Sequence, residues 1–257
     1  GFTFVSTVEV LSLLGLKPVL VDVDACTFNM DPDRIKAAIT PRTRAIIPVH
    51  LFGQPADMFH IQQIAMEHGL FIIEDNAQSL GSVVFCPDGK SKMSGTIGNI
   101  GTTSFFPTKT LACYGDGGAL ITSDTHLAGK LEMIVNHGSR IKYHNDILGV
   151  NSRLDAIQAA ILRVNLRHLD DFIARRRQVA KYYDAHLGSE PRIRIPRVSN
   201  HGTHVYHQYT LLLDPDIRDI VREQLTGKGI PTMIYYPIPL SLQKAFASAG
   251  YQKGDFR

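Results

Sequence analysis

The stretch that decides the fold is residues 71–78, which read Phe71-Ile72-Ile73-Glu74-Asp75-Asn76-Ala77-Gln78. An apolar run that ends in acidic residues is typical of a buried strand in a parallel sheet. In open α/β sheets, ligands bind beyond the carboxyl ends of such strands. We therefore expect Asp75 to lie at one edge of a sheet, beside a binding site.

Helical and strand-like patterns alternate on both sides of this stretch. The spacing of apolar residues predicts helices over residues 7–14, 31–39, 58–68 and about 127–135, and strands over residues 18–23, 45–49, 70–73, 102–106 and 118–122. Gly69 stands where a helix C-cap belongs, and residues 85–101 are typical of a loop or hairpin. The alternation predicts an α/β fold with a mostly parallel sheet flanked by helices.

The second half of the chain has a different pattern. Residues 154–186 predict one long helix, and the Pro-rich stretch 191–196 follows it. Beyond that stretch, the patterns predict a strand over 205–213, a helix over 216–225 and a strand over 231–235. We therefore expect three parts, which are a large domain over residues 1–150, a linking long helix over 151–187, and part of a smaller C-terminal α+β domain over 188–257.

Composition excludes several classes of protein. The 257 residues are 44% hydrophobic, and 27 Lys and Arg against 24 Asp and Glu give a net charge of only +3. This balance argues against a polycation that binds nucleic acid or membranes. No apolar run approaches the ~18 residues of a membrane helix. The three cysteines, Cys26, Cys86 and Cys113, have no metal-site spacing, which favours a reducing compartment and a cytoplasmic location.

A second stretch, Ser104-Phe105-Phe106-Pro107-Thr108-Lys109, follows Asp75 in the chain. Taken singly, Asp75 could cap a helix and Lys109 could be a surface lysine. Together, a carboxylate at a strand end and a lysine among apolar residues are the two groups that pyridoxal phosphate (PLP) catalysis requires. Burial would lower the pKa of Lys109 and favour its neutral, nucleophilic amine.

Two other clusters receive no catalytic role. His201, His204 and His207 recur every third residue, but on a strand this spacing alternates between faces, so we expect no metal site there. Arg175-Arg176-Arg177 on the long helix is interpreted as a solvated face, with an acidic substrate or partner as the alternative.

Many short strings of the chain, in this order, resemble the DegT-type sugar-nucleotide aminotransferases, which are PLP enzymes of fold type I. Separately, the three stretches 136–138, 142–144 and 149–153 are most similar to members that aminate a UDP-linked 3-keto hexuronate. The strings are Gly1-Phe2-Thr3-Phe4, residues 48–54, Glu74-Asp75, Ala77-Gln78, residues 104–109, residues 114–119, Asn136-His137-Gly138, residues 151–155 and Tyr236-Pro237-Ile238-Pro239-Leu240.

The resemblance implies a role for each matching residue of the cofactor site. Lys109 forms the Schiff base with PLP and moves protons, and Asp75 pairs with the pyridine nitrogen. Gln78 lies beside the ring near its 3-oxygen, Phe4 stacks on the ring, and Ser104 binds the phosphate.

The resemblance also implies a homodimer with shared active sites, in which Asn151 reaches the phosphate of the partner's cofactor. At the start of the long helix, free backbone N–H groups and the helix dipole would favour an anion such as the phosphate beside Asn151. The alternative is that Asn151 only caps the helix. Arg153 suits the carboxylate of a sugar, or else forms an ion pair with Asp155. Tyr236 is the other expected substrate-binding residue.

The implied reaction transfers an amino group from glutamate to a keto group of a nucleotide-linked sugar. The expected substrate is a UDP-linked 3-keto N-acetylhexosaminuronate, used for surface polysaccharide. One alternative is a non-catalytic relative that binds nucleotide sugars or acts in regulation. Another is a PLP-dependent sugar dehydratase, but such relatives have His in place of Lys109.

Relatives in this family begin before the position that matches Gly1, with a Gly-Thr pair that holds the cofactor phosphate. They also end in further helices. We therefore expect this chain to be truncated at both ends, with part of its phosphate site supplied elsewhere.

Overall fold

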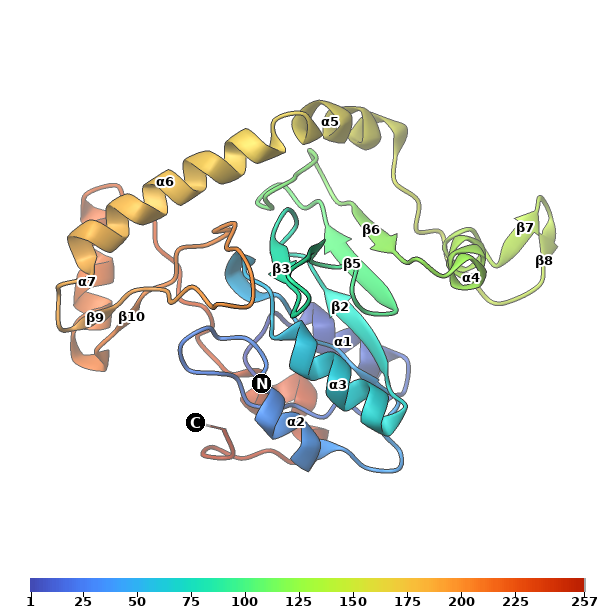
Figure 1. Ribbon diagram of the computed structural model, residues 1–257, viewed down its shortest axis with the longest axis horizontal. Coiled ribbons are helices and arrows are strands. Elements are labelled where there is room, and N and C mark those ends of the chain that lie inside the picture. The colour runs from blue at the N-terminus through green and yellow to red at the C-terminus, as the bar shows by residue number, and fades with distance from the viewer. Residues whose placement is uncertain (257) are drawn as a thin grey trace.

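The computed structural model describes residues 1–256. Its helices are α1 (Ser6–Leu13), α2 (Pro32–Ala38), α3 (Met58–His68), α4 (Thr125–Val135), α5 (Ala156–Leu166), α6 (Leu169–Leu187) and α7 (Pro215–Gly227) (Figure 1). Its strands are β1 (Ala45–Ile46), β2 (Phe71–Asp75), β3 (Val83–Phe85), β4 (Ser91–Met93), β5 (Ile100–Ser104), β6 (Gly118–Ile121), β7 (Ser139–Ile141), β8 (His144–Asn145), β9 (Ile193–Arg194) and β10 (Leu212–Leu213). Short 3-10 turns cover Leu51–Gly53, Leu240–Leu242 and Lys244–Ala249.

The central sheet has the strand order β1-β2-β5-β6. Strands β1, β2 and β5 are parallel, and only β6 runs antiparallel to its neighbour β5. The mostly parallel α/β sheet is therefore confirmed. Because β2 and β5 are parallel, their carboxyl ends, Asp75 and Ser104, meet at the same edge of the sheet.

Helix α3 covers one face of this sheet because its apolar residues are spaced so that they fall on one side of the helix. The Asp57 side chain caps its start by accepting a hydrogen bond from the backbone N–H of His60 (3.3 Å). Gly69 ends it in the left-handed conformation, with φ of 62°, as expected for a C-cap. Its buried face and α2 form a core with β1 and β2, made of Ile35, Ile46, Ala56, Met58, Ile61, Ile64, Ala65, Ile72 and Val84.

A second core lies under the segment that follows β5. Residues of this segment pack against α5 and α6 in a cluster of Phe105, Leu111, Cys113, Leu162, Leu169, Ile173 and Val205. The segment that contains Lys109 therefore rests on a rigid base, although it has no regular secondary structure beyond turns.

The predicted long helix is two helices, α5 and α6, separated by a break at Arg167 and His168. The break changes the direction of the chain, so that both helices contact the same core cluster. The expected strand over 18–23 is also wrong, since only Val23 forms a bridge there, to Met30. Residues 85–101 do form a hairpin, of β3 and β4.

Only Leu212–Leu213 of the expected strand 205–213 is regular, and residues 231–235 form no strand. The backbone of the 205–211 segment bonds to a turn instead of a neighbouring strand. Val205 N–H donates to Gly53 O (2.8 Å), and Gln208 N–H donates to Phe52 O (3.2 Å).

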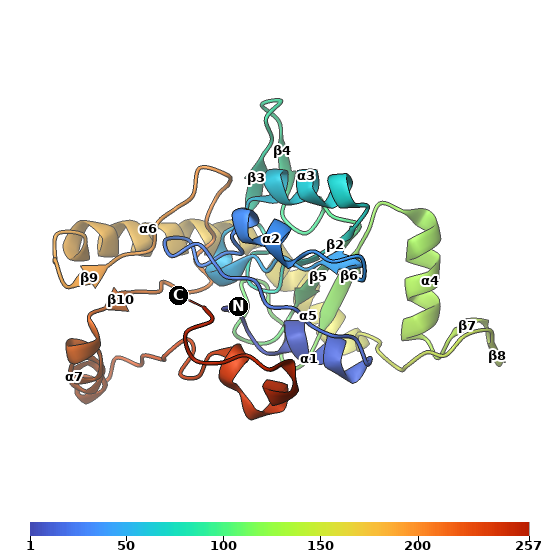
Figure 2. The same cartoon turned by 90° about the horizontal axis from the view of Figure 1, so that it is seen from below.

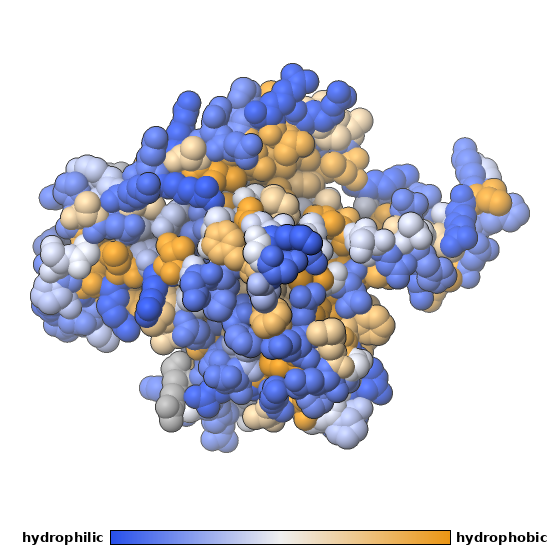
Figure 3. All heavy atoms as spheres, in the orientation of Figure 1, coloured by the Kyte–Doolittle hydropathy of each residue, from blue (hydrophilic) through white to orange (hydrophobic). Residues whose placement is uncertain are grey.

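The outline of the molecule is uneven. Helix α4 and the hairpin of β7 and β8 project to one side, while α6 and α7 extend to the other (Figures 1 and 2). The space-filling view shows the same projection, and its surface is mostly hydrophilic with apolar groups among the polar ones (Figure 3). Within residues 1–256, no helix has the length and apolar character needed to cross a membrane.

The two ends of the chain pack together. Figure 2 shows α1 beside the C-terminal 3-10 turns, and a small core of Val8, Leu240 and Phe246 joins them. A hydrogen bond from Thr7 in α1 to Asp75 at the end of β2 places α1 at the carboxyl edge of the sheet. The division into parts 1–150, 151–187 and 188–257 stays a prediction.

Candidate active site

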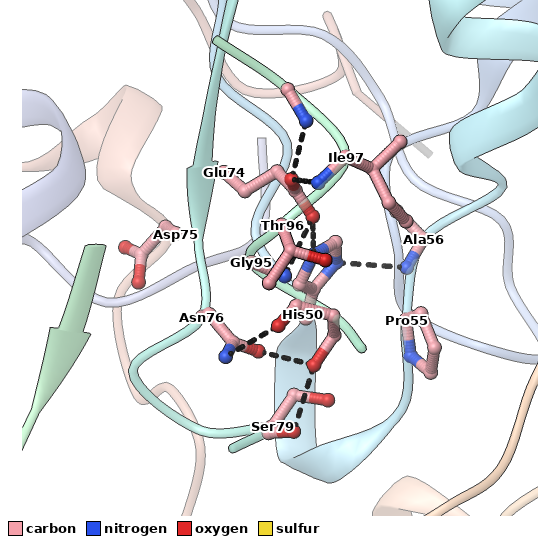
Figure 4. A network of polar contacts seen from close by, with 12 residues as sticks. His50, Pro55, Ala56, Glu74, Asp75, Asn76, Ser79, Gly95, Thr96 and Ile97 are labelled. Carbon is pink, nitrogen blue, oxygen red and sulfur yellow. Dashed lines mark hydrogen bonds and ion pairs between the residues drawn. The ribbon is translucent and has the colours of Figure 1, made fainter. Parts of the chain in front are cut away.

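Asp75 is the last residue of β2, at the carboxyl edge of the sheet. Strand alternation places Asp75 and Glu74 on opposite faces, and Figure 4 shows Asp75 directed away from the Glu74 network. Both of its carboxylate oxygens accept hydrogen bonds. Thr7 Oγ1 donates to Oδ2 (2.6 Å), and the Ala77 N–H donates to Oδ1 (3.1 Å).

Glu74 lies fully buried on the other face of β2. Its carboxylate accepts hydrogen bonds from the backbone N–H groups of Gly95 (2.8 Å), Ile97 (2.6 Å) and Gly98 (2.6 Å), and from His50 Nε2 (2.8 Å) (Figure 4). Burial alone would raise the pKa of Glu74, but these hydrogen bonds outweigh it and hold the pKa below its ordinary value. A charged, fully bonded carboxylate therefore anchors the strand that ends in Asp75.

The proton on His50 can be assigned from its partners. Its Nδ1 accepts a hydrogen bond from the backbone N–H of Ala56 (3.1 Å), so the proton lies on Nε2, which donates to Glu74. On the same face, Ser94 Oγ donates to Asn76 Oδ1 (2.7 Å). This polar core, which the sequence analysis did not anticipate, fixes β2 and the hairpin after it.

Lys109 lies in the turn that follows β5, where its N–H donates to Phe106 O (2.8 Å). Its side chain is half-buried, and burial lowers the pKa of its amine, an effect that the nearby charge of Asp75 opposes. The structure thus brings the amine of Lys109, in the turn after β5, close enough to Asp75, at the end of β2, for their charges to interact. A lowered amine pKa increases the neutral fraction that can attack a carbonyl carbon.

Gln78, Tyr236 and Phe4 gather on the same side as Asp75. The buried Gln78 Oε1 accepts a hydrogen bond from the Phe52 N–H (2.6 Å). Burial raises the pKa of Tyr236 to about 12, an effect that a side-chain hydrogen bond with Gln78 opposes. The Phe4 ring is half-exposed, with its centroid 6.4 Å from that of Tyr236.

Ser104 ends β5 and begins the turn to Lys109. Its Oγ accepts a weak hydrogen bond from the Phe106 N–H (3.3 Å), which leaves the hydroxyl hydrogen as a donor. Its position at the same sheet edge as Asp75 follows from the parallel pairing of β2 and β5.

His207 is a neighbour of Lys109 that the sequence analysis missed as a site residue. Burial first, and then the charges of Lys109 and Arg176, lower the pKa of His207 to about 3, so the ring is neutral at physiological pH. Its Nδ1 is buried and has no hydrogen-bond partner among the described residues.

The histidines at 201, 204 and 207 have three different settings. His201 Nε2 lies 3.4 Å from Asp57 Oδ2, and His204 Nδ1 accepts the Tyr206 N–H (2.9 Å). Within residues 1–256 no cluster of three metal-binding side chains occurs.

The solvated-face interpretation of the arginine run is wrong for two of its members. Arg176 donates to Tyr206 O (3.0 Å), and Arg177 donates to His204 O (2.9 Å). These bonds fix the irregular segment 204–207, because it lacks a neighbouring strand to satisfy its carbonyl groups.

Asn151 and Arg153 are exposed, and no hydrogen bond or ion pair within the described residues joins them to the residues around Asp75. Asn151 does not begin a helix as expected. It pairs with Asn136 in a β-bridge, and α5 starts after Asp155. The alternative of N-capping by Asn151 is also wrong, as is the ion pair of Arg153 with Asp155, which does not occur among the described residues.

The gathered groups suit a phosphorylated pyridine cofactor. They comprise a carboxylate, a half-buried amine, an amide, an aromatic ring and a hydroxyl. Next to Lys109, Thr110 Oγ1 is buried without a partner, as is His207 Nδ1, so polar atoms remain unsatisfied around the amine within the described part of the chain. A cavity of about 390 Å³ at the opposite, amino end of β2 is lined by none of these residues.

Comparisons with known proteins agree on one family. The model of the DegT/DnrJ/EryC1/StrS aminotransferase family matches residues 1–257. The "Pleiotropic regulatory protein" of Geobacillus stearothermophilus is 47% identical, over 99% of this chain and 67% of that protein. The "UDP-2-acetamido-2-deoxy-3-oxo-D-glucuronate aminotransferase" of Pseudomonas aeruginosa is also 47% identical, over 96% of this chain and 67% of that protein.

Solved structures agree with these matches. The structure of S. venezuelae DesV superimposes with a TM-score of 0.93 at 40% identity, covering 99% of this chain and 67% of that chain. Bacillus subtilis NtdA with bound cofactor PMP gives a TM-score of 0.85 at 33% identity, covering 97% of this chain and 57% of that chain. The chain spans about two thirds of the length of the curated relatives described above.

Proposed function

This chain belongs to the DegT/DnrJ/EryC1/StrS aminotransferase family of PLP-dependent enzymes, and we propose that it transfers an amino group from glutamate to the keto group of a nucleotide-linked sugar. The observation that supports this proposal best is the meeting of Asp75 with Lys109, whose amine has a pKa lowered by burial. A non-catalytic binding protein has no need of either feature.

Each site residue has a defined task in this proposal. When bound, PLP supplies an aldehyde that bonds to primary amines and a ring that accepts electrons. Lys109 would hold the cofactor through this aldehyde, and once the amine of glutamate has replaced it there, its freed Nζ would be the base for the proton on the α-carbon of glutamate. Asp75 would keep a proton on the ring nitrogen, Gln78 and Phe4 would orient the ring, and the Ser104 hydroxyl would bind the phosphate.

We assign the sugar from two sources. The P. aeruginosa relative is named for a UDP-linked 3-oxo glucuronate, and an Acidithiobacillus ferrooxidans relative at 46% identity is a "UDP-N-acetyl-3-dehydro-alpha-D-glucosamine 3-aminotranferase". A guanidinium pairs well with a sugar carboxylate, which favours the hexuronate and gives Arg153 its role, with Tyr236 lining the site. The product is an amino sugar on a nucleotide leaving group, which suits glycosyl transfer into surface polysaccharide.

The active unit in this proposal is a homodimer. Asn151 and Arg153 are exposed, and among the described residues no hydrogen bond or ion pair joins them to the residues around Asp75, so their roles require the site of a second copy. Three unpaired cysteines are compatible with a reducing cytoplasm, where we place the reaction.

A regulatory, non-catalytic role is the second candidate, because the Geobacillus relative is named a regulatory protein. The dehydratase alternative is less suitable, since Lys109 stands where such relatives have His. The first two functions differ in a measurable way, and the following experiment separates the transferase from the regulatory role.

The purified protein is mixed with PLP, then with glutamate, and the cofactor absorbance is followed. We expect a long-wavelength band that glutamate abolishes and that a UDP-linked 3-keto hexuronate restores. Asp75→Asn should keep the band but slow both changes by about a hundredfold, equivalent to about 2.7 kcal/mol. A protein that stays colourless with added PLP would support the regulatory role.

The substrate is tested by comparing the hexuronate with a 4-keto-6-deoxy sugar nucleotide, which lacks the carboxylate. Arg153→Ala should reduce the preference for the hexuronate, whereas Arg163→Ala, at an exposed position on the nearby helix α5, should not. If Arg153→Ala keeps the parent's preference, the carboxylate role of Arg153 is wrong.

A further inference from the structure

Asp75 receives its two hydrogen bonds from very different parts of the chain. The Ala77 N–H belongs to the turn directly after β2, so this bond is local and involves no other side chain. Thr7 lies 68 residues away, in the first turn of α1, and its hydroxyl donates to Oδ2 at 2.6 Å. A distance of this size is typical of a hydroxyl bonded to an ionised carboxylate. Thr7 is therefore the long-range restraint on the orientation of the carboxylate.

The restraint is stiff at both ends. Thr7 is β-branched, so a helix leaves it few side-chain rotamers. Its neighbour Val8 is buried against Leu240 and Phe246, which fixes α1 against the C-terminal 3-10 turns. On the other side of the bond, β2 is held by the fully bonded Glu74. Neither partner can move without disturbing a core.

We infer that Thr7 is a positioning residue that sets the orientation of the Asp75 carboxylate toward the ring nitrogen of the cofactor, an inference that rests on the proposed function. With Thr7 in place, rotation of the carboxylate would break a bond at each oxygen. The carboxylate is thus oriented before the cofactor arrives, and binding loses less conformational freedom. Without the hydroxyl, only the Ala77 bond would remain.

The test uses three substitutions in α1. Thr7→Val keeps the shape and removes the hydroxyl, Thr7→Ser restores the hydroxyl, and Ser6→Ala removes the neighbouring hydroxyl as a matched control. Each is made in the parent and in an Asp75→Ala background. The dissociation constant of PLP is measured by absorbance titration of the cofactor-free protein, and its thermal midpoint is measured separately.

We expect Thr7→Val to raise the dissociation constant of PLP about tenfold, while Thr7→Ser stays within about threefold of the parent. Ser6→Ala should leave it unchanged. In the Asp75→Ala background, Thr7→Val should add no further increase, because the group through which it acts is absent. The midpoint pH of the bound cofactor's absorbance should also move in Thr7→Val and return in Thr7→Ser.

Three outcomes would overturn the inference. A Thr7→Val variant with a lower thermal midpoint that binds PLP like the parent would leave Thr7 a purely structural contact between α1 and β2. An equal increase in both backgrounds would mean that Thr7 does not act through Asp75. If the parent itself binds no PLP, the proposed function fails and this inference falls with it, whereas the first two outcomes leave the proposed function intact.

Discussion

At the residue scale, the chemistry depends on the environment of a few side chains. Burial lowers the pKa of the Lys109 amine, while Asp75 lies close enough to oppose the shift. Both the burial of Lys109 and its closeness to Asp75 require the segment after β5 to lie near the end of β2. The reactivity of Lys109 is thus a property of its surroundings, and a substitution at this position tests it directly.

Lys109→Ala should abolish the absorbance of covalently bound PLP and all turnover. The fold should survive, because the side chain is half-buried and forms no ion pair within residues 1–256. Absorbance spectra and the thermal midpoint report the two effects. Lys92→Ala, at an exposed position on β4, is the matched control and should change neither. Turnover that persists in Lys109→Ala would contradict the assignment.

At the element scale, β2 separates two functions by alternation. Asp75 faces the site, while Glu74 faces a polar core that includes His50 and the turn at residues 95–98. The turn needs a glycine, because Gly95 has φ of +81° and a Cβ there would lie 2.9 Å from Asn76 Nδ2. Strand β2 therefore positions the Asp75 carboxylate and is itself held in place by the hydrogen bonds of Glu74 on its other face.

Glu74→Gln should destabilise the protein by about 3 kcal/mol at neutral pH, because the buried donors lose a charged acceptor. The folded pKa of Glu74 is below its ordinary value of 4.5, so its stabilising contribution is present above that pH and is lost as the pH falls through the folded pKa. Denaturation at several pH values should therefore show parent and variant converging below about pH 4.5. A difference that is constant down to pH 3 would contradict this account.

Gly53→Ala tests the contact between the 51–53 turn and the segment beside Lys109. Gly53 has φ of +115°, and a Cβ there would lie 2.8 Å from His207 N, a backbone atom that cannot easily move. We expect a loss of about 2–3 kcal/mol in unfolding free energy. Gly15→Ala is the control, since its φ is also positive but nothing lies within 4 Å, and it should cost about 1 kcal/mol. Equal losses would mean that the close approach is unimportant.

At the scale of the whole molecule, one region stands apart from the rest. The arm of α4, β7 and β8 projects from the body (Figure 1). Several apolar side chains on or after it are exposed. Tyr143 is 86% exposed and Leu148 is 99% exposed, values that a monomer rarely tolerates for large apolar groups in one region. This exposure, together with the exposed Asn151, supports the proposed homodimer.

The shared-site proposal predicts complementation between two inactive variants. Lys109→Ala and Asn151→Ala subunits should each be inactive alone, whereas their heterodimer contains one site with both residues intact. Two-fold symmetry makes the two sites equivalent, so the mixture should regain part of the parent activity. Turnover is measured after subunit exchange has been verified by mass. A mixture that stays inactive, or a fully active monomer, would contradict the shared site.

Local pattern was enough to predict much of this protein. The period of apolar residues predicted α3 with its Gly69 cap, the parallel strands near Asp75, and hence the sheet edge where the site lies. These features depend on neighbours within a few residues, so the sequence contains the information directly. The short motifs along the whole chain, including those around Asp75 and Lys109, together indicated the family that the comparisons confirm.

The tertiary structure alone decided the remaining features. Residues 205–211 have a strand-like composition, but they bond to the 51–53 turn and to Arg176 and Arg177 instead of a sheet. The hydroxyl of Thr7 on Asp75 and the ring of His50 on Glu74 join residues 68 and 24 positions apart. Such pairs leave no periodic pattern in the sequence, because the two partners meet only when the cores pack. The environment that gives Lys109 and Asp75 their chemistry is therefore visible only in the folded structure.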